Sequence, residues 1–122
     1  MFPLQVRSAV AAAPVLPALL SDEEVARILV MTTPWVRKHA NEIPGFERLN
    51  SYFRFRSCDI EEWLGSLERL LEADQVATLM HVPVSWIYAN AEAVPGFIRL
   101  GRYIRFRPKL LRPFLGGEEL AQ

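Results

Sequence analysis

The stretch PGFERLNSYFRFR at residues 44–56 recurs as PGFIRLGRYIRFR at residues 95–107, and this recurrence is the strongest indication of the fold. The offset that aligns these two stretches also aligns residues 19–64 with residues 70–115 without a gap, and 16 of the 46 pairs are identical. Self-similarity at a fixed spacing indicates duplication of one structural unit. The sequence of 122 residues is therefore expected to contain two copies of a small unit.

The first copy predicts two helices separated by a tight turn. Ser21 and Glu24 form a capping-box pattern at the start of the first helix. Thr32 is expected to cap a second helix that carries Pro34 in its first turn and runs to about Asn41. Apolar residues at helical spacing predict the buried faces of these helices: Val25, Ile28, Leu29, Val36, Ala40 and Ile43.

A β-hairpin and a third helix are expected to follow. Apolar and polar residues alternate on both sides of Asn50-Ser51, and the second copy has Gly101-Arg102 at the same hairpin tip. Asp59 is expected to open the third helix, and Pro108 opens its counterpart. Gly65-Ser66 is the only break after it, so this helix either ends there or continues into the second copy. Matched aromatic residues are assigned to core packing: Trp35, Trp86, Phe46, Phe97, Trp63 and Phe114.

Together these elements predict a mainly α fold with small β-hairpin wings, built from two tandem winged helix-turn-helix units. The first eighteen residues contain Pro14 and Pro17, which interrupt the apolar segment, so an arm is favoured over a secretory signal. The expected organisation is an Ala/Pro-rich arm at 1–18, unit one at 19–67, unit two at 68–116 and a tail at 117–122.

Three stretches carry a resemblance to a known family: LLSDEEVA at 19–26, VPVSWIY at 82–88 and PGFIRLGRYIRF at 95–106. They resemble the small excisionase-type, or MerR-like, helix-turn-helix DNA-binding domains. The resemblance covers residues 19–116, and it departs from the family where Asn50-Ser51 replaces the usual Gly-Arg at the first wing tip. It implies binding of double-stranded DNA, with the second helix in the major groove and the wing on the backbone or in the minor groove.

The helix residues expected to contact DNA lie opposite the predicted buried faces. An exposed face with Arg, Lys and Asn suits the major groove, where Arg can bridge guanine and Asn can bridge adenine. The corresponding face of unit two has no cation and carries Glu92. A solvated charged face is the alternative interpretation. The candidate residues are Thr33, Pro34, Arg37, Lys38 and Asn41 in unit one, and Ser85, Tyr88 and Ala89 in unit two.

The wings supply the second set of candidate DNA contacts. Residues 97–112 contain six basic residues and no acidic ones. If Ile104 and Phe106 face the core, the side chains of Tyr103, Arg105 and Arg107 should project together toward phosphates. The alternative is that arginine stems cover a small core. The wing candidates are Arg48, Ser51, Tyr52, Arg54, Arg56, Arg99, Arg102, Tyr103, Arg105 and Arg107.

Overall composition narrows the remaining function classes. Lys plus Arg and Asp plus Glu both number 14, which argues against nonspecific binding to polyanions. The single cysteine and two histidines predict neither a disulfide nor a metal site, and no cofactor or catalytic arrangement is expected. No apolar run is long enough for a membrane span, so no membrane partner is expected and a cytoplasmic, nucleoid-associated protein is predicted.

Two hypotheses for the function follow. The first is a sequence-specific DNA-binding protein of a phage or mobile element, acting as an excisionase-like directionality factor or a small transcription regulator. Its expected partners are double-stranded DNA with a direct-repeat site, further copies of the chain bound head to tail, and a recombinase. The second is a protein–protein interaction module that reuses the winged fold.

Overall fold

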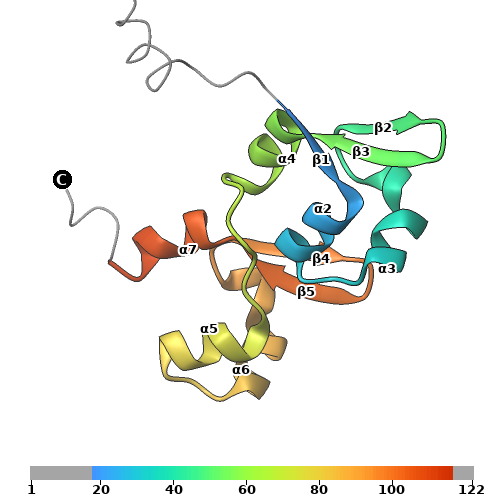
Figure 1. Ribbon diagram of the computed structural model, residues 1–122. Helices are drawn as coiled ribbons and strands as arrows, with labels where there is room; N and C mark the ends of the chain where they lie inside the picture. The colour runs from blue at the N-terminus through green and yellow to red at the C-terminus, as the bar shows by residue number, and fades with distance from the viewer. Residues whose placement is uncertain (1–17, 117–122) are drawn as a thin grey trace, which may run out of the picture.

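The computed structural model describes residues 18–116, and the predicted arm before residue 18 and the tail after residue 116 lie outside the described residues (Figure 1). The first half comprises β1 (Leu19–Ser21), α2 (Asp22–Leu29), α3 (Thr33–Lys38), the 3-10 turn η1 (Ala40–Glu42), β2 (Phe46–Leu49), β3 (Tyr52–Arg56) and α4 (Ser57–Leu64). The second half comprises α5 (Ala73–Met80), α6 (Val84–Asn90), the 3-10 turn η2 (Ala91–Ala93), β4 (Phe97–Leu100), β5 (Tyr103–Phe106) and α7 (Pro108–Phe114).

The helix starts in the first half follow the predicted capping chemistry. The Ser21 hydroxyl accepts from the Glu24 amide at 3.1 Å, while the Glu24 carboxylate accepts from the Ser21 amide at 2.8 Å. The Thr32 hydroxyl accepts from the Trp35 amide at 3.2 Å, and Pro34 lies in the first turn of α3. These contacts satisfy amide groups that have no partner within the helix. Both predicted caps are confirmed.

The predicted fold class is wrong. Residues 18–116 form a mixed α/β structure with two small antiparallel sheets, rather than a mainly α fold made plainly of two winged helix-turn-helix units. In the first half, β1 pairs with β3 and gives a three-stranded sheet in the order β1-β3-β2. In the second half, a single bridge between Leu71 and Phe106 takes the place of this extra pairing, beside the two-stranded sheet β4-β5. Three-residue β1 is too short to show alternation in sequence, which explains the error.

The two halves share packing. The first core cluster contains Val25, Leu29, Val36 and Phe55, and it also takes in Leu100 from β4. A second cluster is built around Val76, Ile87 and other residues of the second half, with Phe106 completely buried. Figure 1 shows hairpin β4–β5 between the pair α2–α3 on one side and the pair α5–α6 on the other.

The connection between the halves is not helical. Helix α4 begins at Ser57, two residues before the predicted start at Asp59, and ends at Leu64. Gly65 follows it with φ +85, a left-handed conformation that glycine adopts without steric cost. A continuous helix into the second half is therefore excluded. Leu70, further along this connection, is buried in the first core and donates its amide to the carbonyl of Ile28 at 2.8 Å.

Two of the six aromatic residues assigned to core packing are exposed. Trp35, Phe46 and Trp63 pack against the first cluster and Phe97 against the second. Trp86 is 40% exposed and Phe114 is 57% exposed. Trp35 differs from Trp86 because the tip of hairpin β4–β5 covers it: a Cβ atom built on Gly101 would lie 3.7 Å from the Trp35 ring.

Candidate nucleic-acid interface

Helix α3 is shorter than the sequence predicts. It ends at Lys38, and Asn41 lies in the 3-10 turn η1 instead of the helix. The backbone N of His39 donates to the carbonyl of Trp35 at 3.0 Å, and the His39 ring stacks on the Trp35 ring with centroids 4.0 Å apart. Val36 and Ala40 are buried as expected, because the 3-10 turn continues the same apolar face. His39 is thus a packing residue.

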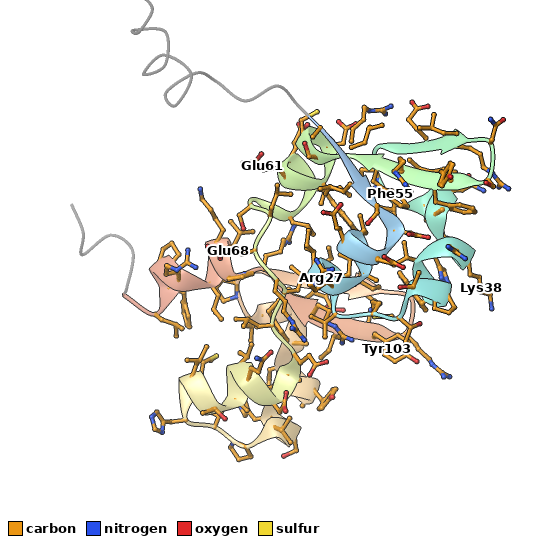
Figure 2. The ribbon with its side chains drawn as sticks, viewed as in Figure 1. Arg27, Lys38, Phe55, Glu61, Glu68 and Tyr103 are labelled. Atoms are coloured by element: carbon orange, nitrogen blue, oxygen red, sulfur yellow. The ribbon has the colours of Figure 1, made fainter. Side chains whose placement is uncertain are left out.

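The predicted face of α3 is exposed. Pro34, Arg37, Lys38 and Asn41 are exposed, and Thr33 is half-buried. Figure 2 shows Lys38 at the outer side of α3. Three polar or cationic side chains, those of Arg37, Lys38 and Asn41, therefore lie where a ligand could reach them.

An ion pair orients Arg37. Its Nε atom lies 2.5 Å from Oδ2 of Asp22, whose side chain is 8% exposed, while the Arg37 side chain is 58% exposed. Asp22 lies in the first turn of α2, where a carboxylate also interacts favourably with the helix dipole. Asp22 therefore fixes one edge of the guanidinium and leaves much of the side chain in solvent. Sequence reasoning missed this residue because an acid at a helix start is common.

Arg37 and Arg48 meet over one aromatic ring. Cζ of Arg37 lies 5.9 Å and Cζ of Arg48 lies 4.7 Å from the centroid of Phe53. Arg48 and Phe53 are also direct partners across β2 and β3, and Nε of Arg48 donates to the carbonyl of Asn50 at 3.0 Å. Attraction between a cation and an aromatic face holds both side chains near the same place. We call the set Arg37, Lys38, Asn41 and Arg48 the basic face.

The other side of hairpin β2–β3 carries Leu49, Tyr52 and Arg54. Leu49 is 46% exposed and Tyr52 is 60% exposed, and Ser51 is exposed at the tip. Nη1 of Arg54 donates to the carbonyl of Phe53 at 2.8 Å, and its guanidinium lies 5.0 Å from the centroid of Tyr52. We call Leu49, Tyr52 and Arg54 the outer face of the first hairpin.

Two carboxylates neutralise Arg56. Its Nε atom donates to Asp59 at 2.6 Å, and its Nη1 atom donates to Glu47. Hydrogen bonds to Asp59 and then to Glu47 raise the pKa of Arg56 above its ordinary value. With both acids beside it, Arg56 adds little positive potential to the hairpin.

In unit two, the predicted helix face is exposed and uncharged. Ser85, Tyr88 and Ala89 are exposed on α6, with Tyr88 at 64%. The sequence of α6, VSWIYAN, supplies no cation to this face. It therefore lacks the chemistry of the basic face.

Second-hairpin cations divide into two groups. Arg99 and Arg102 are exposed and lie over Phe97 and Tyr103 at 5.5 and 5.6 Å. Arg105 instead donates through Nε and Nη2 to the carbonyls at the end of α2, and its side chain is 11% exposed.

Arg107 also turns inward. It donates to the carbonyls of Gly96, Trp63 and Phe97 at 3.2, 3.2 and 2.9 Å. The expectation that Arg105 and Arg107 project with Tyr103 into solvent is wrong for the two arginines, because carbonyls of neighbouring elements accept their hydrogen bonds. The alternative, arginine stems covering a small core, describes them better.

Comparison with protein-family models, curated proteins and solved structures finds no match for this chain. Among residues 18–116, none of the helices has the length and apolar character needed to cross a bilayer. Within the same residues, no group of three or more His, Cys, Asp or Glu side chains could hold a metal ion.

Proposed function

We propose that the protein binds double-stranded DNA through the basic face of its first half. The observation that carries this proposal is the convergence of cations from two elements: Arg37 of α3 and Arg48 of β2 share the Phe53 ring, with Lys38 beside them on α3. Lys38 and Arg48 suit phosphate oxygens, and Arg37 with Asn41 suits base edges.

The second half contributes less to this proposed interface. Its helix α6 carries no cation, and Arg105 and Arg107 are engaged with backbone carbonyls. Arg99 and Arg102 remain exposed and are available for phosphates. The proposal therefore assigns base contacts to the first half and, at most, phosphate contacts to the second.

An excisionase-like directionality factor and a small transcription regulator both use these contacts. A recombinase partner and an origin in a phage or mobile element belong to the first role. Footprinting on the DNA that flanks the gene separates them, because the first role requires sites near an attachment site and the second requires sites over a promoter. Tandem copies of the site in one direction are the predicted arrangement, since the proposed contacts have no two-fold symmetry.

The direct test is an anisotropy titration of the full chain with labelled flanking DNA at several salt concentrations. Log affinity should fall linearly against log salt, because each neutralised phosphate releases counterions. Lys38→Ala and Arg48→Ala should each reduce this slope by about one unit. Lys109→Ala is the control, because Lys109 is an exposed cation on α7 and belongs to none of the proposed DNA contacts.

Arg37→Lys tests base reading separately from charge. Lysine keeps the positive charge beside Asp22 but lacks the rigid planar fork through which arginine donates two parallel hydrogen bonds to guanine. The ratio of the affinities for the flanking DNA and for a scrambled duplex should fall about tenfold, which is the discrimination expected from one bidentate contact. The proposal fails if competitor DNA abolishes all binding, or if Lys109→Ala weakens binding as much as Arg48→Ala.

A protein–protein module is the second candidate function. The exposed apolar residues Trp86 and Tyr88 on α6 favour it. The full chain would then give no DNA binding above nonspecific levels.

A further inference from the structure

The second hairpin makes a specific contact with the first half of the same chain. Leu100, 4% exposed, is buried in the first core cluster, and the tip at Gly101 lies against Trp35. Nε of Arg105 donates to the carbonyl of Leu29 at 3.1 Å, and Nη2 donates to the carbonyl of Val30 at 2.7 Å. Hairpin β4–β5 thus buries Leu100 in the first core, covers Trp35 and donates hydrogen bonds to the carbonyls at the end of α2.

The first hairpin carries the same residue types at the equivalent positions, but within residues 18–116 they make no such contact. Leu49, the counterpart of Leu100, is 46% exposed. Nη1 of Arg54 donates to the carbonyl of the preceding residue at 2.8 Å, as Nη1 of Arg105 does at 2.8 Å. Within residues 18–116, Nε and Nη2 of Arg54 have no hydrogen-bond partner, whereas these are the two atoms with which Arg105 clamps α2.

The tip of the first hairpin also has a suitable shape. Asn50 has φ 58, and its counterpart Gly101 has φ 64, so both tips turn through the left-handed region. A Cβ atom at Gly101 would lie 3.7 Å from the Trp35 ring, which is an ordinary van der Waals distance. A Cβ atom at this position, such as that of Asn50, is therefore compatible with the same approach to a tryptophan.

The surface that would receive this hairpin is present on the second half. His81 ends α5 with φ 59 and ψ 46, matching Val30 at the end of α2 with φ 58 and ψ 48. The carbonyls of Met80 and His81 therefore repeat the pair that accepts from Arg105, and within residues 18–116 no side chain donates to them. Trp86, the counterpart of Trp35, is 40% exposed.

We propose that hairpin β2–β3 of one chain docks on α5–α6 of a second copy, as hairpin β4–β5 docks on α2–α3 within the chain. Leu49 and the Asn50 tip would cover Trp86, and Arg54 would donate to the carbonyls of Met80 and His81. The internal contact is the reason to name a second copy as the occupant, because it joins the same two surfaces. Such a contact is heterologous, so it leaves one docking surface free at each end and adds copies head to tail.

This contact should be weaker than the internal one. Glu47 stands where Ile98 packs against the first core, and it forms an ion pair with Arg56. A carboxylate at that point replaces apolar burial with a polar group. Association is therefore expected to depend on concentration.

The proposal is independent of DNA binding. Arg48 and Phe53 lie on the face of the first hairpin that is turned to its own core, whereas Leu49 and Arg54 lie on the outer face. The basic face therefore stays accessible when the outer face is docked. Tyr52 and Arg54 are predicted from the sequence to contact DNA from the wing, and this proposal assigns them to self-association instead.

Sedimentation velocity of the nuclease-treated full chain, without DNA, provides the test. Reductant is included because Cys58 is exposed and could form an intermolecular disulfide. The weight-average mass should rise from 13.9 kDa with concentration and pass the dimer value without a plateau. A mass of 13.9 kDa at every concentration, or a plateau at a dimer, overturns the proposal.

Two surface variants identify the contact. Leu49→Glu disables the docking hairpin, and Trp86→Ser disables the receiving surface. Each variant alone should therefore self-associate about tenfold or more weakly than the parent protein and sediment as a monomer where the parent associates. Mixed together, they should form a one-to-one dimer that grows no further, because each retains the surface that the other lacks. Phe114→Ser is the control, since Phe114 is 57% exposed on α7 and belongs to neither surface. Loss of association in this control, or no dimer in the mixture, overturns the assignment.

Discussion

Hairpins β2–β3 and β4–β5 share the pattern Tyr-x-Arg-Phe and pair their strands in equivalent register. The outer face of the first is in solvent, whereas that of the second is packed against the other half of the chain. A few substitutions accompany this difference. Glu47 of the first hairpin becomes Ile98 in the second, and the apolar side chain joins the first core. Identical motif residues thus acquire different roles through the residues beside them.

Arg56 and Arg107 show the same effect at one pair of positions. Arg56 binds the carboxylates of Glu47 and Asp59, but their counterparts in the second half are Ile98 and Leu110. Without those acids, Arg107 donates to three backbone carbonyls. An arginine in a repeated motif therefore takes whichever acceptors its surroundings supply.

Truncation of the matched leucines should separate the two hairpins most clearly in stability. Leu100→Ala should lower the free energy of unfolding by about 2–5 kcal/mol, because it empties a site in the shared core. Leu49→Ala should change it by no more than about 0.5 kcal/mol, because Leu49 is exposed. Urea unfolding at low protein concentration measures both. Equal losses would contradict the difference in burial between the hairpins.

An intermediate effect is expected from the matched arginines. Arg105→Ala leaves the carbonyls of Leu29 and Val30 without their side-chain donor, and should cost about 1–3 kcal/mol. Arg54→Ala should cost less than about 0.5 kcal/mol in the monomer, since its clamp atoms bind nothing within residues 18–116. Hydrogen exchange of the amides at the end of α2 should accelerate only in Arg105→Ala. Acceleration of these amides in Arg54→Ala would refute the assignment.

Substitution of Arg56 should change the stability least, and the dependence of this change on salt identifies its origin. Arg56→Ala removes an exposed ion-pair network, so the stability difference from the parent protein should shrink as sodium chloride is raised to about 1 M. Arg107→Ala removes hydrogen bonds to carbonyls, and its difference should change little over the same range. Denaturation midpoints in urea at low and high salt provide the measurement. A salt-sensitive loss at Arg107 would be inconsistent with its contacts.

Local chemistry was predictable where neighbouring residues determine it. The capping box of Ser21, the cap at Thr32 and both hairpin tips follow from residues within a few positions of each other. The exposed α3 face with Arg37 and Lys38 also follows, because helical spacing fixes which positions lie opposite a buried stripe.

Contacts distant in sequence could not be predicted in this way. The pairing of β1 with β3 depends on a three-residue segment that carries no period, and it changes the fold class. The ion pair of Asp22 with Arg37 depends on how α2 and α3 are packed. The inward turn of Arg105 depends on carbonyls some 75 residues away, at Leu29 and Val30.

Short segments of the sequence are enough to predict a duplicated unit with two helices and a hairpin in each copy, because periodicity, caps and turns are local properties. The difference between the two copies arises from tertiary packing. Packing one hairpin against the other half buries Leu100 and occupies Arg105, while the same residues of the other hairpin, Leu49 and Arg54, remain available. The physical reason is that burial and hydrogen-bond partners depend on neighbours in space, which a repeated sequence does not specify.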